Sequence, residues 1–236
     1  MASTSTFHSI DSFADVVARL STVYHVSDIV LETSTCLFIL ESPHLQELKF
    51  GAPVAGASGA TMSKHIFGLD YARMPLGRMV KKNAETGAGR PRLSAIGLIN
   101  VSNIPLQAQA YDPDTRQQLS DWFGDMNVVR TQNQRLSFPN PRQQDIQNWL
   151  VQALRTKLQA YRGRSVTLIP CGRFAQKFFR LAGLSDPAWR VIENVPHPSY
   201  NSWDRTAYQA QVAAVVSAIE QAAALLTQMS EGTSRA

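Results

Sequence analysis

The chain has 236 residues and a mass of 26.1 kDa, a size that predicts one α/β domain, with two small domains as the alternative. Apolar residues make up 44% and charged residues 17% of the sequence, which excludes disordered and collagen-like classes. The two cysteines, Cys36 and Cys171, are too few for a disulfide scaffold or a four-cysteine metal site. No run reaches the roughly 18 consecutive apolar residues of a membrane span, and the first residues lack the features of a secretory signal. We therefore expect a cytoplasmic protein with no membrane association.

The sequence carries a moderate excess of positive charge. Lys and Arg total 23 against 18 Asp and Glu, which gives a net charge of +5 and an isoelectric point near 9.4. This balance suits a polyanionic partner such as a nucleic acid, because each neutralised phosphate releases condensed counterions. Many enzymes without such a partner are also mildly basic, so charge alone leaves the partner open.

Apolar residues recur at spacings that predict helices alternating with short buried strands. Continuous apolar runs predict strands at residues 36–40, 93–101, 165–169 and 189–192. Helical spacing and capping residues predict helices at residues 12–24, 60–68, 141–163, a segment after Gly172, and 204–228. This alternation predicts a mostly parallel sheet covered by helices on both faces.

Other stretches predict irregular structure. A Gly- and Ala-rich loop is expected at residues 51–60, and a flexible surface loop at residues 83–92. Residues 106–140 are polar and Gln-rich, which predicts a long connection with one helical segment near residues 114–123. Both ends of the chain, residues 1–11 and 229–236, are expected to be flexible.

Polar side chains follow three of the predicted strands. Glu41 comes directly after the first strand, Asn100 closes the second, and His197 follows the fourth. The carboxyl ends of parallel strands meet at one edge of a sheet, where ligands bind. There the carboxylate can face a developing cation, the amide can read a planar ligand, and the imidazole can stabilise an oxyanion. Each residue can also have an ordinary structural role. Glu41 could be a surface carboxylate or a helix-capping partner, Asn100 could satisfy the backbone of a turn, and His197 could be a structural residue between Pro196 and Pro198.

Several local signals carry no function by themselves. The spacing of Gly51, Gly56 and Gly59 matches neither a dinucleotide fingerprint nor a phosphate-binding P-loop. His44 and His65 are too isolated to indicate a metal site, and Cys36 is expected to pack as a small apolar side chain.

The joint pattern resembles the uracil-DNA glycosylase superfamily, and within it the iron–sulfur branch typified by thermophilic bacteria. Residues 40–59 match the first motif of that branch without a gap, at Glu41, Pro43, Glu47, Gly51, Pro53, Gly56 and Gly59. The run Ile99-Asn100-Val101 resembles the middle segment, and His197-Pro198-Ser199 matches the last motif. The step from strand to glycine and helix at residues 168–172 is also similar, so the resemblance covers about residues 36–203.

The resemblance implies one domain with an α/β/α sandwich around a four-stranded, mainly parallel sheet. It also implies hydrolysis of the N-glycosidic bond between deoxyribose and a damaged base in DNA, uracil first, with no cofactor. Glu41 would stabilise the sugar cation and position water, while Asn100 would read the base edge. His197, in its neutral form, would donate to the developing base oxyanion.

The resemblance assigns further residues to substrate and DNA. Pro43, His44, Val54 and Pro198 would line the substrate site, and Ser42 and Ser199 would hold flanking phosphates. Tyr200, Trp203 and Arg205 would form a loop that probes the duplex; for Trp203, packing onto the last helix is the alternative.

The sequence departs from the family pattern at several positions. The four cluster cysteines are missing, so we expect no iron–sulfur cluster. Val54 replaces the Phe that stacks on the flipped base, and Phe50 lies nearby as a possible substitute. The most efficient branch has an Asp where this chain has Ser42, which leaves the carboxylate role to Glu41. His44 replaces a Gly and either excludes the thymine methyl group or only caps the loop.

Two other functions stay open. The chain could be a nucleic-acid-binding relative with weak catalysis, or a hydrolase of free nucleosides that uses the same Glu, Asn and His. DNA affinity without base release would indicate the first, and nucleoside turnover without DNA affinity the second.

Overall fold

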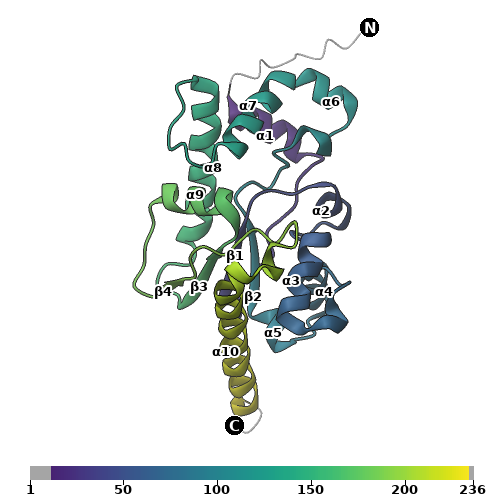
Figure 1. Ribbon diagram of the computed structural model, residues 1–236, viewed down its shortest axis with the longest axis vertical. Coiled ribbons are helices and arrows are strands. Elements are labelled where there is room, and N and C mark those ends of the chain that lie inside the picture. The colour runs from purple at the N-terminus through teal and green to yellow at the C-terminus, as the bar shows by residue number, and fades with distance from the viewer. Residues whose placement is uncertain (1–11, 234–236) are drawn as a thin grey trace.

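The computed structural model describes residues 12–233, so the predicted flexibility of residues 1–11 and 234–236 lies outside the described part. Within it, four parallel strands form one sheet in the order β2-β1-β3-β4 (Figure 1). The strands are β1 (Cys36–Leu40), β2 (Ile96–Asn100), β3 (Val166–Pro170) and β4 (Trp189–Val191). All four overlap the predicted strand segments, although residues 93–94 of the second segment are helical. The strands β1, β2 and β3 are buried as parallel strands covered on both faces usually are, whereas β4 at the edge of the sheet is largely exposed.

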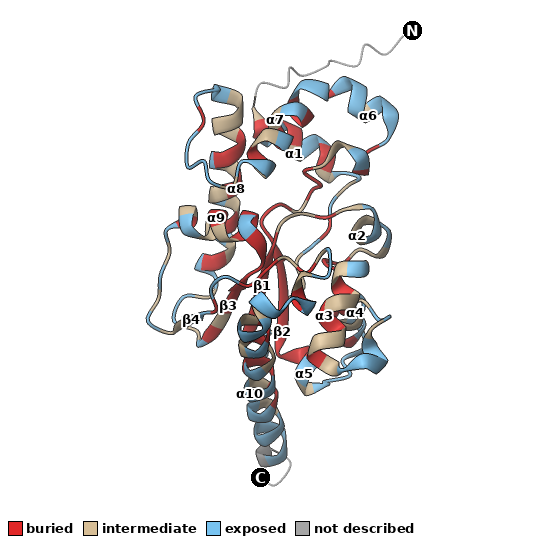
Figure 2. Ribbon diagram, viewed as in Figure 1, coloured by how far each residue is buried: buried red, intermediate tan, exposed pale blue. Residues whose placement is uncertain are grey.

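Helices cover both faces of this sheet, and the predicted three-layer α/β/α architecture is confirmed. Leu37 and Ile39 of β1 belong to a core shared with α1 (Phe13–Ser21), α7 (Ser120–Thr131), α8 (Pro141–Gln159) and α9 (Gly172–Ala182). Cys36, Phe38 and Leu40 point the other way, into a core shared with α3 (Ala57–Phe67), α4 (Leu76–Thr86), α5 (Pro91–Ser94) and α10 (Gln209–Thr233). The strands β1, β2 and β3 therefore form the buried middle layer, red in Figure 2, with the more exposed β4 at the edge.

Local sequence signals explain where several helices begin. The Ser12 hydroxyl accepts from the backbone N–H of Asp15, whose carboxylate accepts in return from the Ser12 N–H, so the two form a capping box for α1. Before α8, the Asn140 side chain accepts from the Arg142 N–H, and Pro141 occupies the first helical position. Both starts agree with the predicted ones.

The structure is more helical than the sequence pattern predicted. The short helix α2 (Leu45–Phe50) was not expected, and α4 runs into the stretch 83–92 that we predicted as a flexible loop. Asn83 explains that difference, because it is buried on α4. Its side chain donates a hydrogen bond to the Ser94 hydroxyl and accepts one from the Arg90 N–H. These bonds tie the remaining turn, residues 87–90, to the helix.

The polar connection at residues 106–140 also differs from the prediction. It contains α6 (Pro113–Gln118) and the longer α7 in place of one helical segment. The carboxylate of Asp112 caps α6 by accepting from the Thr115 N–H, at 2.9 Å. The buried residues of α7 are Trp122, Phe123, Met126 and Val129, which stand among polar residues too numerous for a clear amphipathic pattern.

The last helix begins later and ends later than predicted. Two 3₁₀ turns, Ser202–Asp204 and Thr206–Tyr208, precede α10. Residues 229–233, which we expected to be flexible, continue the helix. The segment Thr206–Glu231 is long and apolar enough to cross a membrane by length and composition, with 33% of its most apolar window buried. Here its Val215 and Ile219 are buried in the core beside the sheet.

Candidate active site

A cavity of about 550 Å³ brings the three predicted strand-end residues together. Glu41 follows β1, Asn100 ends β2, and His197 lies in the loop after β4; all three line the cavity. The predicted residues Ser42, His44, Val54, Ser199 and Tyr200 line it too. Parallel pairing explains the convergence, since Leu40 is the register partner of Asn100 and so places Glu41 at the same edge.

Asn100 is fully buried, and both polar atoms of its side chain lack a hydrogen-bond partner. Its backbone, in contrast, is held at both ends: the N–H donates to Asp28 Oδ1 at 2.9 Å, and the carbonyl accepts from Lys157 Nζ at 2.6 Å. Buried amides are normally satisfied, and an unsatisfied one costs about 1–3 kcal/mol. The side chain is therefore free to pair with a ligand that offers one acceptor and one donor.

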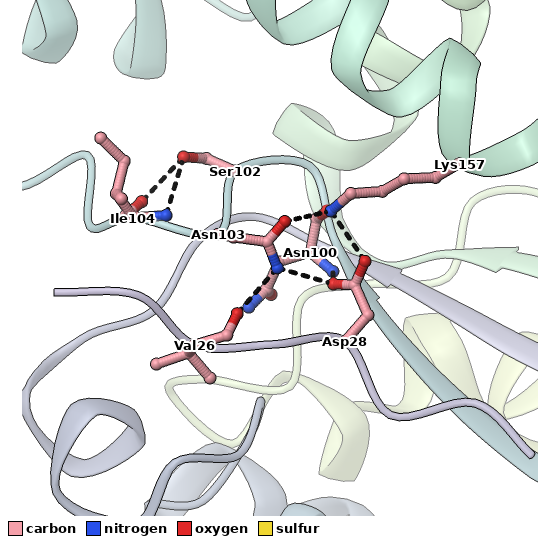
Figure 3. A network of polar contacts seen from close by, with 7 residues as sticks. All are labelled: Val26, Asp28, Asn100, Ser102, Asn103, Ile104 and Lys157. Atoms are coloured by element: carbon pink, nitrogen blue, oxygen red, sulfur yellow. Dashed lines mark hydrogen bonds and ion pairs between the residues drawn. The ribbon is translucent and has the colours of Figure 1, made fainter. Parts of the chain in front are cut away.

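A polar network behind the cavity fixes this backbone (Figure 3). Lys157 Nζ lies 2.8 Å from Asp28 Oδ2 and 2.6 Å from Asn103 Oδ1, while Asn103 Nδ2 donates to Asp28 Oδ1 at 2.9 Å. Burial lowers the pKa of Lys157, and the adjacent Asp28 carboxylate opposes that shift. Asn103 is thus a structural residue, whereas Asn100 is the one of the two that lines the cavity.

His197 is held as a hydrogen-bond donor toward a ligand. Its Nδ1 accepts from the backbone N–H of Ser199 at 3.2 Å and lies 2.8 Å from the Ser199 hydroxyl. Burial lowers the pKa of His197, which favours the neutral ring. A neutral ring that accepts at Nδ1 carries its proton on Nε2. Ser199 therefore orients the imidazole, a role that the resemblance did not assign to it.

Gly172, the first residue of α9, supports the His197 backbone directly. Its φ is +85°, and a Cβ there would lie 2.7 Å from the Cβ of His197. Its N–H donates to the Val195 carbonyl at 2.9 Å, which connects the end of β3 to the loop after β4. A side chain at this position would displace His197.

We expect Gly172→Ala to reduce His197-dependent activity about 10- to 100-fold, since small misplacements of a catalytic group cost that much. The variant should also lose about 1–3 kcal/mol of stability from backbone strain. Gly163→Ala is the matched control, because Gly163 has a φ of +71° but open space around its Cβ position. The rate of any reaction that depends on His197, together with thermal unfolding, measures the two effects. Equal activity in both variants would contradict the packing argument.

Glu41 is half-buried, with 20% of its side chain exposed, and an arginine that the sequence analysis missed lies beside it. Arg130 of α7 places its Nη1 3.6 Å from Glu41 Oε1. Burial raises the pKa of Glu41, and the Arg130 guanidinium counteracts that shift. No signal pointed to Arg130, because it lies in the polar stretch that we interpreted as a connection.

Glu47 shapes the wall of the cavity beneath Val54. Its carboxylate accepts from the backbone N–H groups of His44 and Val54, each at 2.7 Å. Val54 has a φ of +47°, and Gly59 packs so closely against the Val54 carbonyl that a Cβ there would lie 1.7 Å from its oxygen. Burial, in the main, raises the pKa of Glu47 to about 7. Glu47 therefore stabilises a strained wall, although the sequence analysis gave it no role beyond its match to the motif.

Some predicted residues lie elsewhere. Trp203 is 1% exposed, and its indole Nε1 donates to the Pro196 carbonyl at 2.9 Å while the ring packs beside Phe38 and His65. This burial corrects the expectation that Trp203 probes the duplex and favours the alternative of packing. Phe50 pairs with Arg78, whose Cζ lies 4.1 Å from the ring centroid, and is not part of the cavity wall, so it does not replace the missing aromatic ring.

The rest of the predicted DNA-probing loop is accessible. Tyr200 is 90% exposed with a φ of +54°, and Arg205 is exposed. Pro43 and Pro198 are buried within the loops that carry Ser42 and Ser199. The Ser42 hydroxyl accepts from the Leu106 N–H at 3.4 Å, which ties its loop to the segment after β2.

The cysteines and histidines give no sign of a metal site. Cys36 and Cys171 are free and buried, and burial raises the pKa of the Cys36 thiol to about 11 and that of Cys171 further still. Both therefore pack as apolar side chains, as predicted for Cys36. Within residues 12–233, no group of three or more His, Cys, Asp or Glu side chains is placed to hold a metal ion.

Comparison with protein-family models finds no match to this chain, and comparison with curated proteins likewise finds none. The functional argument therefore depends on the geometry of the cavity.

Proposed function

We propose that this protein is a DNA glycosylase that hydrolyses the N-glycosidic bond of uracil or a related damaged base. The observation that carries the proposal is the fully buried amide of Asn100, with no partner for either polar atom, in a cavity shared with Glu41 and His197. One amide with a free donor and a free acceptor suits the edge of a pyrimidine base, which presents both.

The proposed reaction divides between the three side chains. The damaged base leaves the DNA stack and enters the cavity, where Asn100 pairs with its edge. As the bond breaks, positive charge grows on the sugar and negative charge on the base. The Glu41 carboxylate stabilises the sugar cation and orients the attacking water, and the His197 Nε2–H donates to the base oxygen. The exposed Tyr200 and the basic Arg205 lie on the loop that we assign to the duplex.

The test is an assay of the purified chain on oligonucleotides that contain one uracil, in single-stranded and duplex form. Alkali then cleaves the strand at any abasic site. Strand cleavage that depends on uracil is expected. Salt-dependent DNA affinity without cleavage would instead indicate a binding relative, and release of free base from nucleosides without DNA affinity would indicate a nucleoside hydrolase.

His44 provides a prediction about base selectivity. It lines the cavity directly before α2, where a side chain can occupy the space beside C5 of the base. We expect His44→Gly to admit 5-methyluracil and 5-hydroxymethyluracil and to narrow the preference for uracil about 10- to 200-fold, the range typical of a methylene-sized difference. The measurement is the ratio of excision rates in matched single-stranded oligonucleotides. An unchanged ratio would show that His44 only caps α2.

A further inference from the structure

Glu41 lies in an environment that disfavours its ionised form. Only 20% of its side chain is exposed, burial raises its pKa, and a second carboxylate, Glu47, lines the same cavity. The other titratable or charged groups of the cavity wall are His44 before α2, Arg130 on α7, and His197 and Tyr200 after β4. Of these, Arg130 is the permanent cation. A carboxylate that must face a sugar cation needs its negative charge, so some group has to maintain it.

Contacts within α7 and with the core hold Arg130 beside Glu41. It lies at the C-terminal end of α7, and the buried Met126 and Val129 anchor that helix in the core. Its Nη2 donates to the Asn127 Oδ1 at 3.1 Å, which fixes the guanidinium from its own helix. The opposite Nη1 lies 3.6 Å from Glu41 Oε1, longer than a normal hydrogen bond. The guanidinium is therefore placed to attract the Glu41 carboxylate as an ion pair.

We propose that Arg130 is a positioning residue that keeps Glu41 ionised and oriented at neutral pH, an inference that rests on the proposed glycosylase function. In this proposal α7, which lies in the connection between β2 and β3, carries the residue that maintains the charge of Glu41. Without the guanidinium, burial would favour the neutral acid of Glu41, which neither stabilises a cation nor activates water.

The first experiment needs no substrate. The side-chain carboxyl carbons of glutamate are labelled with ¹³C in the full chain, the Glu41 signal is assigned by its loss in Glu41→Gln, and its titration is followed by NMR. An opposite charge at this distance shifts a carboxyl pKa by about one unit or more, so in Arg130→Met the titration midpoint of Glu41 should move up by at least about one pH unit. Arg130→Lys keeps the charge and should retain most of the wild-type midpoint.

A matched control separates this effect from the loss of any positive charge that contacts α7. Arg142 of α8 forms an ion pair with Asp125 of α7 at 3.0 Å, outside the cavity. Arg142→Met should leave the Glu41 titration unchanged. Thermal unfolding of each variant reports whether it folds. If Arg130→Met does not fold, Arg130→Gln, which also removes the charge, should show the same upward shift of the Glu41 midpoint.

The second experiment measures single-turnover base release from a uracil oligonucleotide across pH. The acidic limb of the pH–rate profile of Arg130→Met should move to higher pH together with the Glu41 midpoint. For a shift of one pH unit, the variant should be about tenfold slower than the wild type at pH values below both midpoints. The plateau at high pH should stay within about threefold of the wild type, because Glu41 is ionised there in both proteins.

The outcomes are distinguishable. An unchanged Glu41 midpoint in Arg130→Met, or a loss of DNA affinity at every pH with no shift of the limb, would overturn the inference and make Arg130 a phosphate contact or a structural residue. If the wild type releases no base, the proposed function fails, and the NMR titration still decides whether Arg130 controls the charge of Glu41.

Discussion

Replacing Glu41 with glutamine is expected to slow base release about 100-fold or more, because a neutral amide offers no negative charge to the sugar cation and activates water poorly. The substitution keeps the shape of the side chain, so the chain should fold and bind DNA as the wild type does. The rate is measured under single-turnover conditions on a uracil oligonucleotide, which separates chemistry from binding.

Glu85→Gln provides the control for Glu41→Gln, since Glu85 is an exposed glutamate on α4 whose ion pair with Lys81 spans 3.8 Å. This variant should keep the wild-type rate. A Glu41→Gln protein that releases base at the wild-type rate would remove Glu41 from the mechanism. The carboxylate role would then fall to Glu47, the other carboxylate of the cavity.

Removing the imidazole of His197 is the second change with a large expected effect. His197→Ala deletes the proposed Nε2–H donor to the departing base, and loss of one such donor costs about 10²–10³ in rate. The fold should survive, because the ring is half-buried at the cavity and its hydrogen-bond partner, Ser199, lies in the same loop. The effect should appear in the rate of bond cleavage, with little change in DNA affinity.

His25→Ala is the control for His197→Ala, because His25 is an exposed histidine outside the cavity. A second comparison tests the orientation argument. Ser199→Ala removes the hydroxyl near Nδ1 but keeps the backbone N–H that sets the tautomer, so its loss should be smaller than that of His197→Ala. A Ser199→Ala rate as low as that of His197→Ala would show that the hydroxyl itself acts on the substrate.

Much of the fold could be predicted from residue order. Strands buried on both faces appear as unbroken apolar runs, and so Cys36–Leu40 and Val166–Pro170 stood out without any structural information. The interpretation failed where burial is intermittent. In α7 the four buried residues stand among polar ones in a short segment, and α2 has no buried residue at all. Such short segments depend on tertiary contacts for their helical structure, so apolar periodicity does not reveal them clearly.

The sequence by itself determined which three strand ends would meet, since parallel strands bring Glu41, Asn100 and His197 to one edge. Only the tertiary structure decided what those side chains can do. Asp28 and Lys157 lie far from Asn100 in the chain, yet they hold its backbone and leave its amide unpaired. Likewise, Arg130 reaches Glu41 only through the packing of α7, because charge and hydrogen-bond partners depend on distances in space that the order of residues does not encode.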